Sequence, residues 1–150
     1  MKILVSACLL GQRCKYNGGD NYSEALAAFL EGHEVVPVCP ELAGGLSVPR
    51  LPCEIAGGIV VNDRGESVDE AFRRGAALCL QRAVDEGIEL AILQPRSPSC
   101  GVRQIYDGTF SGRLIEGSGI FAGLLLENGF KAVEPDDLKG QTWNTEKKSS

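Results

Sequence analysis

Three short apolar runs, each bounded by glycine, proline or charged residues, limit the folds open to this chain more than any other feature. They cover residues 2–7, 34–38 and 89–93, and each has the length and composition of a buried strand. Segments with helical spacing separate them. Because strands that alternate with helices form parallel sheets covered on both faces, the sequence predicts a single α/β domain with an open, doubly wound, Rossmann-like sheet.

The clearest predicted helix spans residues 68–86. Ser67 and Glu70 have the spacing of a capping box, and Gly87 follows where helices often end. Small and apolar residues recur on one face at steps of three and four, and Cys79 is among them, so we expect Cys79 to fill the core.

Weaker patterns complete the predicted domain. They indicate helices over residues 22–31 and 118–128 and short strands over 58–62 and 130–134. We expect the domain to cover residues 1–137 and residues 138–150 to form a polar, frayed tail.

The charge of the chain disfavours nucleic acid as a partner. Fifteen basic residues face 20 acidic ones, for a formal net charge of -5, and no basic cluster lies within the predicted domain. No apolar run approaches the roughly 20 residues of a membrane span, and the run after Lys2 is too short for a signal peptide. We therefore expect a soluble cytoplasmic protein, whose six cysteines stay reduced.

Three of these cysteines, Cys8, Cys39 and Cys100, follow the three predicted central strands. Parallel strands end at one edge of a sheet, so these thiols should meet in one crevice. Their long spacings and the lack of a fourth ligand argue against a structural zinc site, since His33 precedes its strand and lies at the other edge. Three thiolates suit a cubane iron–sulfur cluster with one open iron. The alternative is that small buried cysteines simply pack well there.

Two polar residues accompany these thiols. Glu41 lies two positions after Cys39, where a carboxylate suits general acid–base chemistry. Ser97 lies three positions before Cys100 and can hydrogen-bond a substrate or relay a proton. A solvated surface glutamate and a turn-forming serine are the alternatives. A serine hydrolase is disfavoured because no G-x-S-x-G elbow occurs, and the glycine pairs fit neither the NAD nor the ATP phosphate pattern.

A tight turn or hairpin is predicted around Asp107 and Gly108. It either covers the crevice as a lid or has a purely structural role.

Together these motifs resemble the thiouracil desulfurase family, long known as a domain of unknown function, over about residues 1–135. The motifs that carry the resemblance are SACLLG, CKYNGG, VCPELAGGL, PRLPCE, SPSCG and IYDGTFSG.

The resemblance implies a [4Fe-4S] cluster bound by the cysteines matching Cys8, Cys39 and Cys100, with one iron not ligated by protein and easily lost in air. It implies that the residue matching Glu41 activates water and the one matching Ser97 assists proton transfer. The products would be the oxo base and sulfide, without net electron transfer.

The substrate implied is a small thiolated base or nucleoside such as 2-thiouracil. Thiolated tRNA is the substrate of some relatives that carry an additional domain. Cys14 and Cys53 depart mildly from the family pattern and are either spare cysteines or additional ligands. The competing hypothesis is a noncatalytic module, such as a zinc site, a sulfur carrier or a redox sensor, that uses the same thiols.

Overall fold

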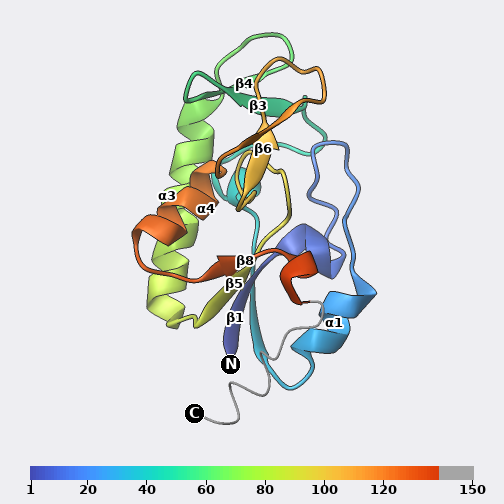
Figure 1. Ribbon diagram of the computed structural model, residues 1–150, viewed down its shortest axis with the longest axis vertical. Helices are drawn as coiled ribbons and strands as arrows, with labels where there is room; N and C mark the ends of the chain where they lie inside the picture. The colour runs from blue at the N-terminus through green and yellow to red at the C-terminus, as the bar shows by residue number, and fades with distance from the viewer. Residues whose placement is uncertain (139–150) are drawn as a thin grey trace.

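A four-stranded parallel sheet runs through the middle of the molecule in the computed structural model, which describes residues 1–138 (Figure 1). Its strands are β1 (Lys2–Ser6), β2 (Glu34–Val38), β5 (Leu90–Ile92) and β8 (Ala132–Val133), in the spatial order β2-β1-β5-β8. β1 pairs in parallel with β2 on one side and with β5 on the other, and β8 adds to β5. The predicted open parallel sheet is confirmed.

Helices cover both faces of this sheet. The long helix α3 (Asp69–Glu86) and α4 (Ile120–Glu127) pack together over one face, and α1 (Glu24–Leu30) lies on the other (Figure 1). A 3-10 turn, η1 (Ala7–Leu10), extends the α1 side.

The side chains of β1 alternate between the two hydrophobic clusters. Leu4 packs in the cluster under α3 and α4, and Ile3 and Val5 pack in the cluster under α1. All three are fully buried. A strand covered on both faces must be apolar at every position, which explains why this segment reads as a continuous apolar run.

The predicted capping box at the start of α3 is wrong. Ser67 forms a β-bridge with Val61, and the Val68 amide donates to the Val60 carbonyl at 2.9 Å, so the preceding hairpin holds these residues and the helix begins at Asp69. The C-terminal prediction is confirmed, because Gly87 ends α3 in the left-handed conformation at φ 65°. Cys79 lies on the buried face of α3 and fills the core, as expected.

Two antiparallel hairpins lie beyond the carboxyl ends of the central strands, at the top of Figure 1. One joins β3 (Cys53–Ala56) to β4 (Ile59–Asn62), and the other joins β6 (Gln104–Tyr106) to β7 (Leu114–Glu116). The predicted strand over 58–62 therefore exists, but it pairs with β3, for which no strand was predicted. The hairpin predicted at Asp107 and Gly108 is confirmed, with a longer loop over residues 107–113.

A short helix, α2 (Pro40–Ala43), follows β2 and touches α3 backbone to backbone. A Cβ atom added at Gly75 would lie 1.8 Å from the Pro40 carbonyl oxygen, and one at Gly44 would lie 2.0 Å from the Ala71 oxygen. Only glycine allows this approach. The contact fixes α2 against the longest helix of the protein.

The last described turn, η2 (Pro135–Leu138), still belongs to the folded body, because Leu138 packs against the core cluster under α1. The rest of the predicted polar tail, residues 139–150, lies outside the described residues.

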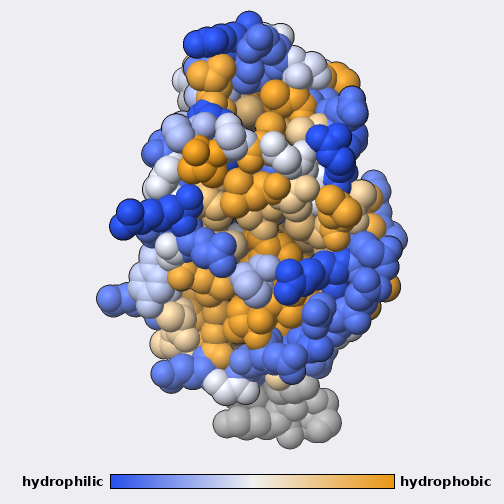
Figure 2. Space-filling model, turned by 180° about the vertical axis from the view of Figure 1, so that it is seen from behind, coloured by the Kyte–Doolittle hydropathy of each residue, from blue (hydrophilic) through white to orange (hydrophobic). Residues whose placement is uncertain are grey.

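Seen from behind, hydrophobic residues gather along the middle of the surface between hydrophilic margins (Figure 2). Over residues 1–138, the helices are too short or too polar to span a membrane.

The close approach of α2 and α3 yields a stability prediction. Gly75→Ala should lower the free energy of unfolding by about 3 kcal/mol, because the new methyl group overlaps the Pro40 carbonyl and the helices must separate. Gly123→Ala in α4 is the matched control, since its Cβ would meet nothing nearer than 3.8 Å and alanine favours a helix by up to about 1 kcal/mol. Urea denaturation measures both. Equal stabilities of the two variants would contradict the tight contact.

Candidate functional site

A cavity of about 510 Å³ lies at the carboxyl edge of the central sheet, where β1, β2 and β5 end. The segments that follow these three strands line its floor. Every candidate residue predicted from the sequence lines this one cavity: Cys8, Cys39, Glu41, Ser97 and Cys100. The structure therefore brings the predicted side chains together at the strand ends, as the sequence analysis expected.

Cys8 follows β1 in the 3-10 turn η1, which Gly11 closes in the left-handed conformation at φ 97°. This turn reverses the chain immediately after the strand, so Cys8 stays at the sheet edge. Asn21 holds it from the far side of the loop. The Asn21 amide Nδ2 donates to Cys8 Sγ at 3.5 Å, and the Asn21 backbone amide donates to the Cys8 carbonyl at 2.9 Å.

Cys39 and Glu41 take their positions from the start of α2. Cys39 is the N-cap residue in an extended conformation, and Pro40 occupies the first helical position, where its ring favours helix initiation. Glu41 lies in the first turn, and its Oε1 is 3.7 Å from Cys39 Sγ. The thiol and the carboxylate thus form one polar pair in a half-buried position.

Ser97 shapes the loop that carries Cys100. Its Oγ accepts hydrogen bonds from the backbone amides of Ser99 at 3.1 Å and Cys100 at 3.0 Å. With both lone pairs of the oxygen engaged, the hydroxyl proton remains available for donation into the cavity that Ser97 lines. Cys100 is buried, and this burial raises the pKa of its thiol well above the ordinary value.

Ser6 ties the ends of two central strands together at the cavity floor. Its Oγ accepts from the Gln94 amide at 3.0 Å, which joins the end of β1 to the segment after β5. The Ser6 side chain also partly offsets the effect of burial on the pKa of Cys100. The Ser6–Gln94 bond joins the segments that follow β1 and β5 at the cavity.

Cys14 is one of two cavity thiols whose role the sequence analysis left open, the other being Cys53. The Cys14 thiol lines the cavity beside Cys8 and Cys39, and its influence lowers the pKa of the Cys39 thiol and, with that of Asn21, lowers the pKa of Cys8 to about 7. Cys14 keeps its own proton, because thiolates on two sides raise its pKa far above the ordinary range. The signal for it was the glycine between Cys8 and Cys14, which lets the chain double back.

Two further residues are placed apart from this thiol group. Cys53 lines the opposite wall from strand β3, where its Sγ contacts the Leu51 carbonyl at 3.4 Å and burial raises the pKa of the thiol to about 11. His33 lies at the amino edge of the sheet, as expected. Its Nδ1 is 3.0 Å from the N-terminal nitrogen of Met1, and its ring stacks on Phe29.

The spread of the thiols decides what they can hold. Within residues 1–138, no three cysteine, histidine or acidic side chains converge closely enough to bind a single metal ion. A zinc ion needs its ligands at about 2.0–2.3 Å from one centre. An iron–sulfur cluster takes one thiolate per iron, so it suits thiols distributed around a larger cavity.

Comparisons with known proteins agree with this geometry. The family model described as 2-thiouracil desulfurase matches residues 3–137. An uncharacterized protein of Bacillus subtilis (strain 168), YbbK, is 42% identical over 146 residues, covering 91% of this chain and 97% of that protein. The solved structure of a [4Fe-4S]-dependent thiouracil desulfidase, TudS, is 40% identical, superposes with a TM-score of 0.88 and covers 97% of each chain. The resemblance seen in the motifs is thereby confirmed, and the chain belongs to the 2-thiouracil desulfurase family.

Proposed function

We propose that this protein hydrolyses a thiolated nucleobase or nucleoside of the 2-thiouracil type to the oxo base and sulfide. The observation that carries the proposal is the arrangement of Cys8, Cys39 and Cys100 around one cavity together with Glu41 and Ser97. The chain's family and its likeness to a [4Fe-4S]-dependent thiouracil desulfidase support it.

Cys8, Cys39 and Cys100 would hold the cluster. Thiolates are the usual ligands of such clusters, and the lowered pKa of Cys8 and Cys39 prepares both sulfurs for this state. Cys14, whose pKa is raised beside these two thiols, would keep its one proton and donate it to one of them at a time. When bound, the cluster supplies a Lewis-acidic iron with affinity for the sulfur of the substrate, because three protein ligands leave one iron open.

Glu41 is placed to act as the general base. Its carboxylate faces the cavity beside Cys39, so it can remove a proton from a water molecule that attacks the thiocarbonyl carbon. Ser97 supplies the complementary donor. Its oxygen already accepts from two backbone amides, so its hydroxyl would donate its proton to an acceptor in the cavity, such as a substrate heteroatom.

The overall reaction balances without an oxidant or reductant. The oxygen of water forms a bond to the carbon, the carbon–sulfur bond breaks, and the sulfur leaves with its electron pair as sulfide. The two protons of water end on the sulfide after passing through the carboxylate. No electron is gained or lost by the protein.

The size and charge of the site favour a small substrate. A cavity of about 510 Å³ lies in the usual range for small-molecule sites, about 300–1,000 Å³. The net charge of -5 opposes binding to a polyphosphate backbone. We place the enzyme in the cytoplasm, where reducing conditions keep all six cysteines free, as they are in the structure.

The deciding experiment uses protein purified or reconstituted without oxygen. Adding 2-thiouracil, with no reductant present, should release uracil and sulfide in equal amounts. Release of sulfide only when a reductant is supplied would refute the hydrolytic scheme. Binding of zinc alone would favour the noncatalytic alternative.

Removal of single thiols tests the ligand set. Replacing Cys8, Cys39 or Cys100 by alanine should abolish the binding of about four irons per chain, since each thiolate holds one iron. Iron and sulfide counts with the visible spectrum measure this. Cys53→Ala is the matched control, because its thiol lies on the opposite wall and should leave the iron content unchanged. Retention of iron by Cys100→Ala together with its loss from Cys14→Ala would show that the ligand set is wrong.

Removal of the carboxylate separates catalysis from cluster binding. Glu41→Gln should keep the iron content and the visible spectrum but lower kcat by at least about 100-fold, because the amide cannot accept the proton of water. Glu70→Gln, on the exposed side of α3, is the control and should retain full activity. An unchanged rate for Glu41→Gln would exclude the proposed base and favour a redox sensor, which needs no such group.

A further inference from the structure

We propose that the β6–β7 hairpin is a substrate clamp, held over the cavity by Glu54, and that Phe110 on its loop selects planar heterocycles by contacting their ring face. This inference rests on the proposed function for the identity of the substrate. The role of Glu54 as a positioning residue stands on contacts within the protein.

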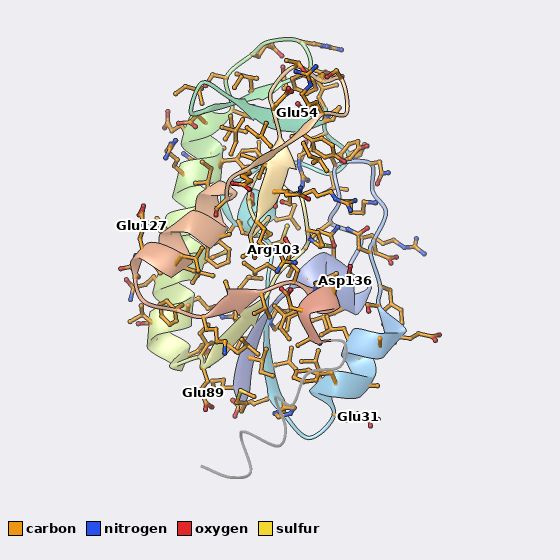
Figure 3. All side chains as sticks on the ribbon, in the orientation of Figure 1. Glu31, Glu54, Glu89, Arg103, Glu127 and Asp136 are labelled. Atoms are coloured by element: carbon orange, nitrogen blue, oxygen red, sulfur yellow. The ribbon has the colours of Figure 1, made fainter. Side chains whose placement is uncertain are left out.

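Glu54 holds the loop through two hydrogen bonds to a single oxygen. Its Oε1 accepts from the backbone amide of Gly108 at 2.9 Å and from that of Phe110 at 3.1 Å. Figure 3 places Glu54 on β3, where the loop of the second hairpin passes it. Bonds from amides to a carboxylate are charge-assisted and therefore stronger than bonds between neutral groups.

The loop also sits directly on the backbone of β3. A Cβ atom at Gly108 would lie 2.7 Å from the Ile55 carbonyl oxygen, so glycine is needed both for space and for its φ of 93°. Within the loop, Asp107 Oδ1 accepts from the amide of Thr109 at 3.0 Å and from its hydroxyl at 2.6 Å. These contacts give the loop a defined shape that docks on the first hairpin.

Phe110 has a backbone conformation that its own residue type disfavours. Its φ is 58°, in the left-handed region that side chains with a Cβ rarely adopt. Such a conformation is strained and persists only where the surroundings hold it. The bond from the Phe110 amide to Glu54 is the contact that holds it. The strained backbone places Phe110 in the wall of the cavity.

The second hairpin contributes two aromatic side chains, Tyr106 and Phe110, to the lining of the cavity, while Glu41 and Ser97 line it from the strand ends. An aromatic side chain recognises a flat ring through offset or edge-to-face contact, which stabilises binding beyond the burial of apolar area. Such contact is insensitive to which ring carbon bears the sulfur. The clamp therefore selects planar heterocycles as a class.

The first test measures amide hydrogen exchange in the reconstituted protein. In Glu54→Ala the amides of Gly108 and Phe110 should exchange at least about tenfold faster than in the wild type, because they lose their acceptor. Glu54→Gln retains an acceptor oxygen and should restore most of the protection. Glu116→Ala, an exposed glutamate on the same hairpin, is the control and should match the wild type. Unchanged exchange in Glu54→Ala would overturn the clamp.

The second test measures kinetics with 2-thiouracil. Phe110→Ala should raise KM by about tenfold and change kcat by less than about threefold, because ring contact contributes to binding while the groups for chemistry remain. Glu54→Ala should give the same pattern, and Glu54→Gln should recover most of the wild-type KM. An unchanged KM in Phe110→Ala would overturn the recognition role. Failure of the wild type to release sulfide would refute the proposed function, while the exchange rates still decide whether Glu54 holds the hairpin.

Discussion

The site depends on the pairing of β1 with β2 and β5. This central strand is buried on both faces and hydrogen-bonded along both edges, so neither it nor its neighbours can slide without exposing apolar side chains. Parallel neighbours end on the same edge. The pairing therefore brings together segments that follow residues 6, 38 and 92, although long stretches of chain separate them. The Ser6 hydroxyl reinforces this edge by binding the Gln94 amide.

A second constraint sets the orientation of the reactive groups at that edge. Gly44 and Gly75 let α2 lie against α3 at backbone distance, so the short helix has one available position. Cys39 caps the start of α2 and Glu41 lies in its first turn, so the contact between the helices also fixes where these two residues lie. The hydrogen bonds that the Ser97 hydroxyl accepts from two backbone amides likewise fix the loop that carries Cys100. Contacts to the backbone thus position Cys39, Glu41 and Cys100.

The sequence predicted the parts of the fold whose side chains face the core. The three central strands and α3 were found because burial on two faces or on one stripe leaves a periodic apolar pattern. β3 was missed because Cys53–Ala56 is half-buried throughout and pairs only with its neighbour β4. The capping box failed because a hairpin hydrogen bond occupies Val68. Cys14 was not assigned because its spacing from Cys8 does not by itself reveal that the loop returns there, and the glycine at position 11 was the one local signal of this turn.

The cavity has two walls of different origin. One consists of strand ends from the main sheet. The other consists of two hairpins that lie outside that sheet, the second of which is joined to the segment after β5 by a bridge between Ile105 and Arg96. Changes in hairpin length or loop sequence would leave the strand register untouched. Substitutions in the hairpin loops can therefore reshape the outer wall of the cavity without moving the segments that carry Cys8, Cys39 and Cys100.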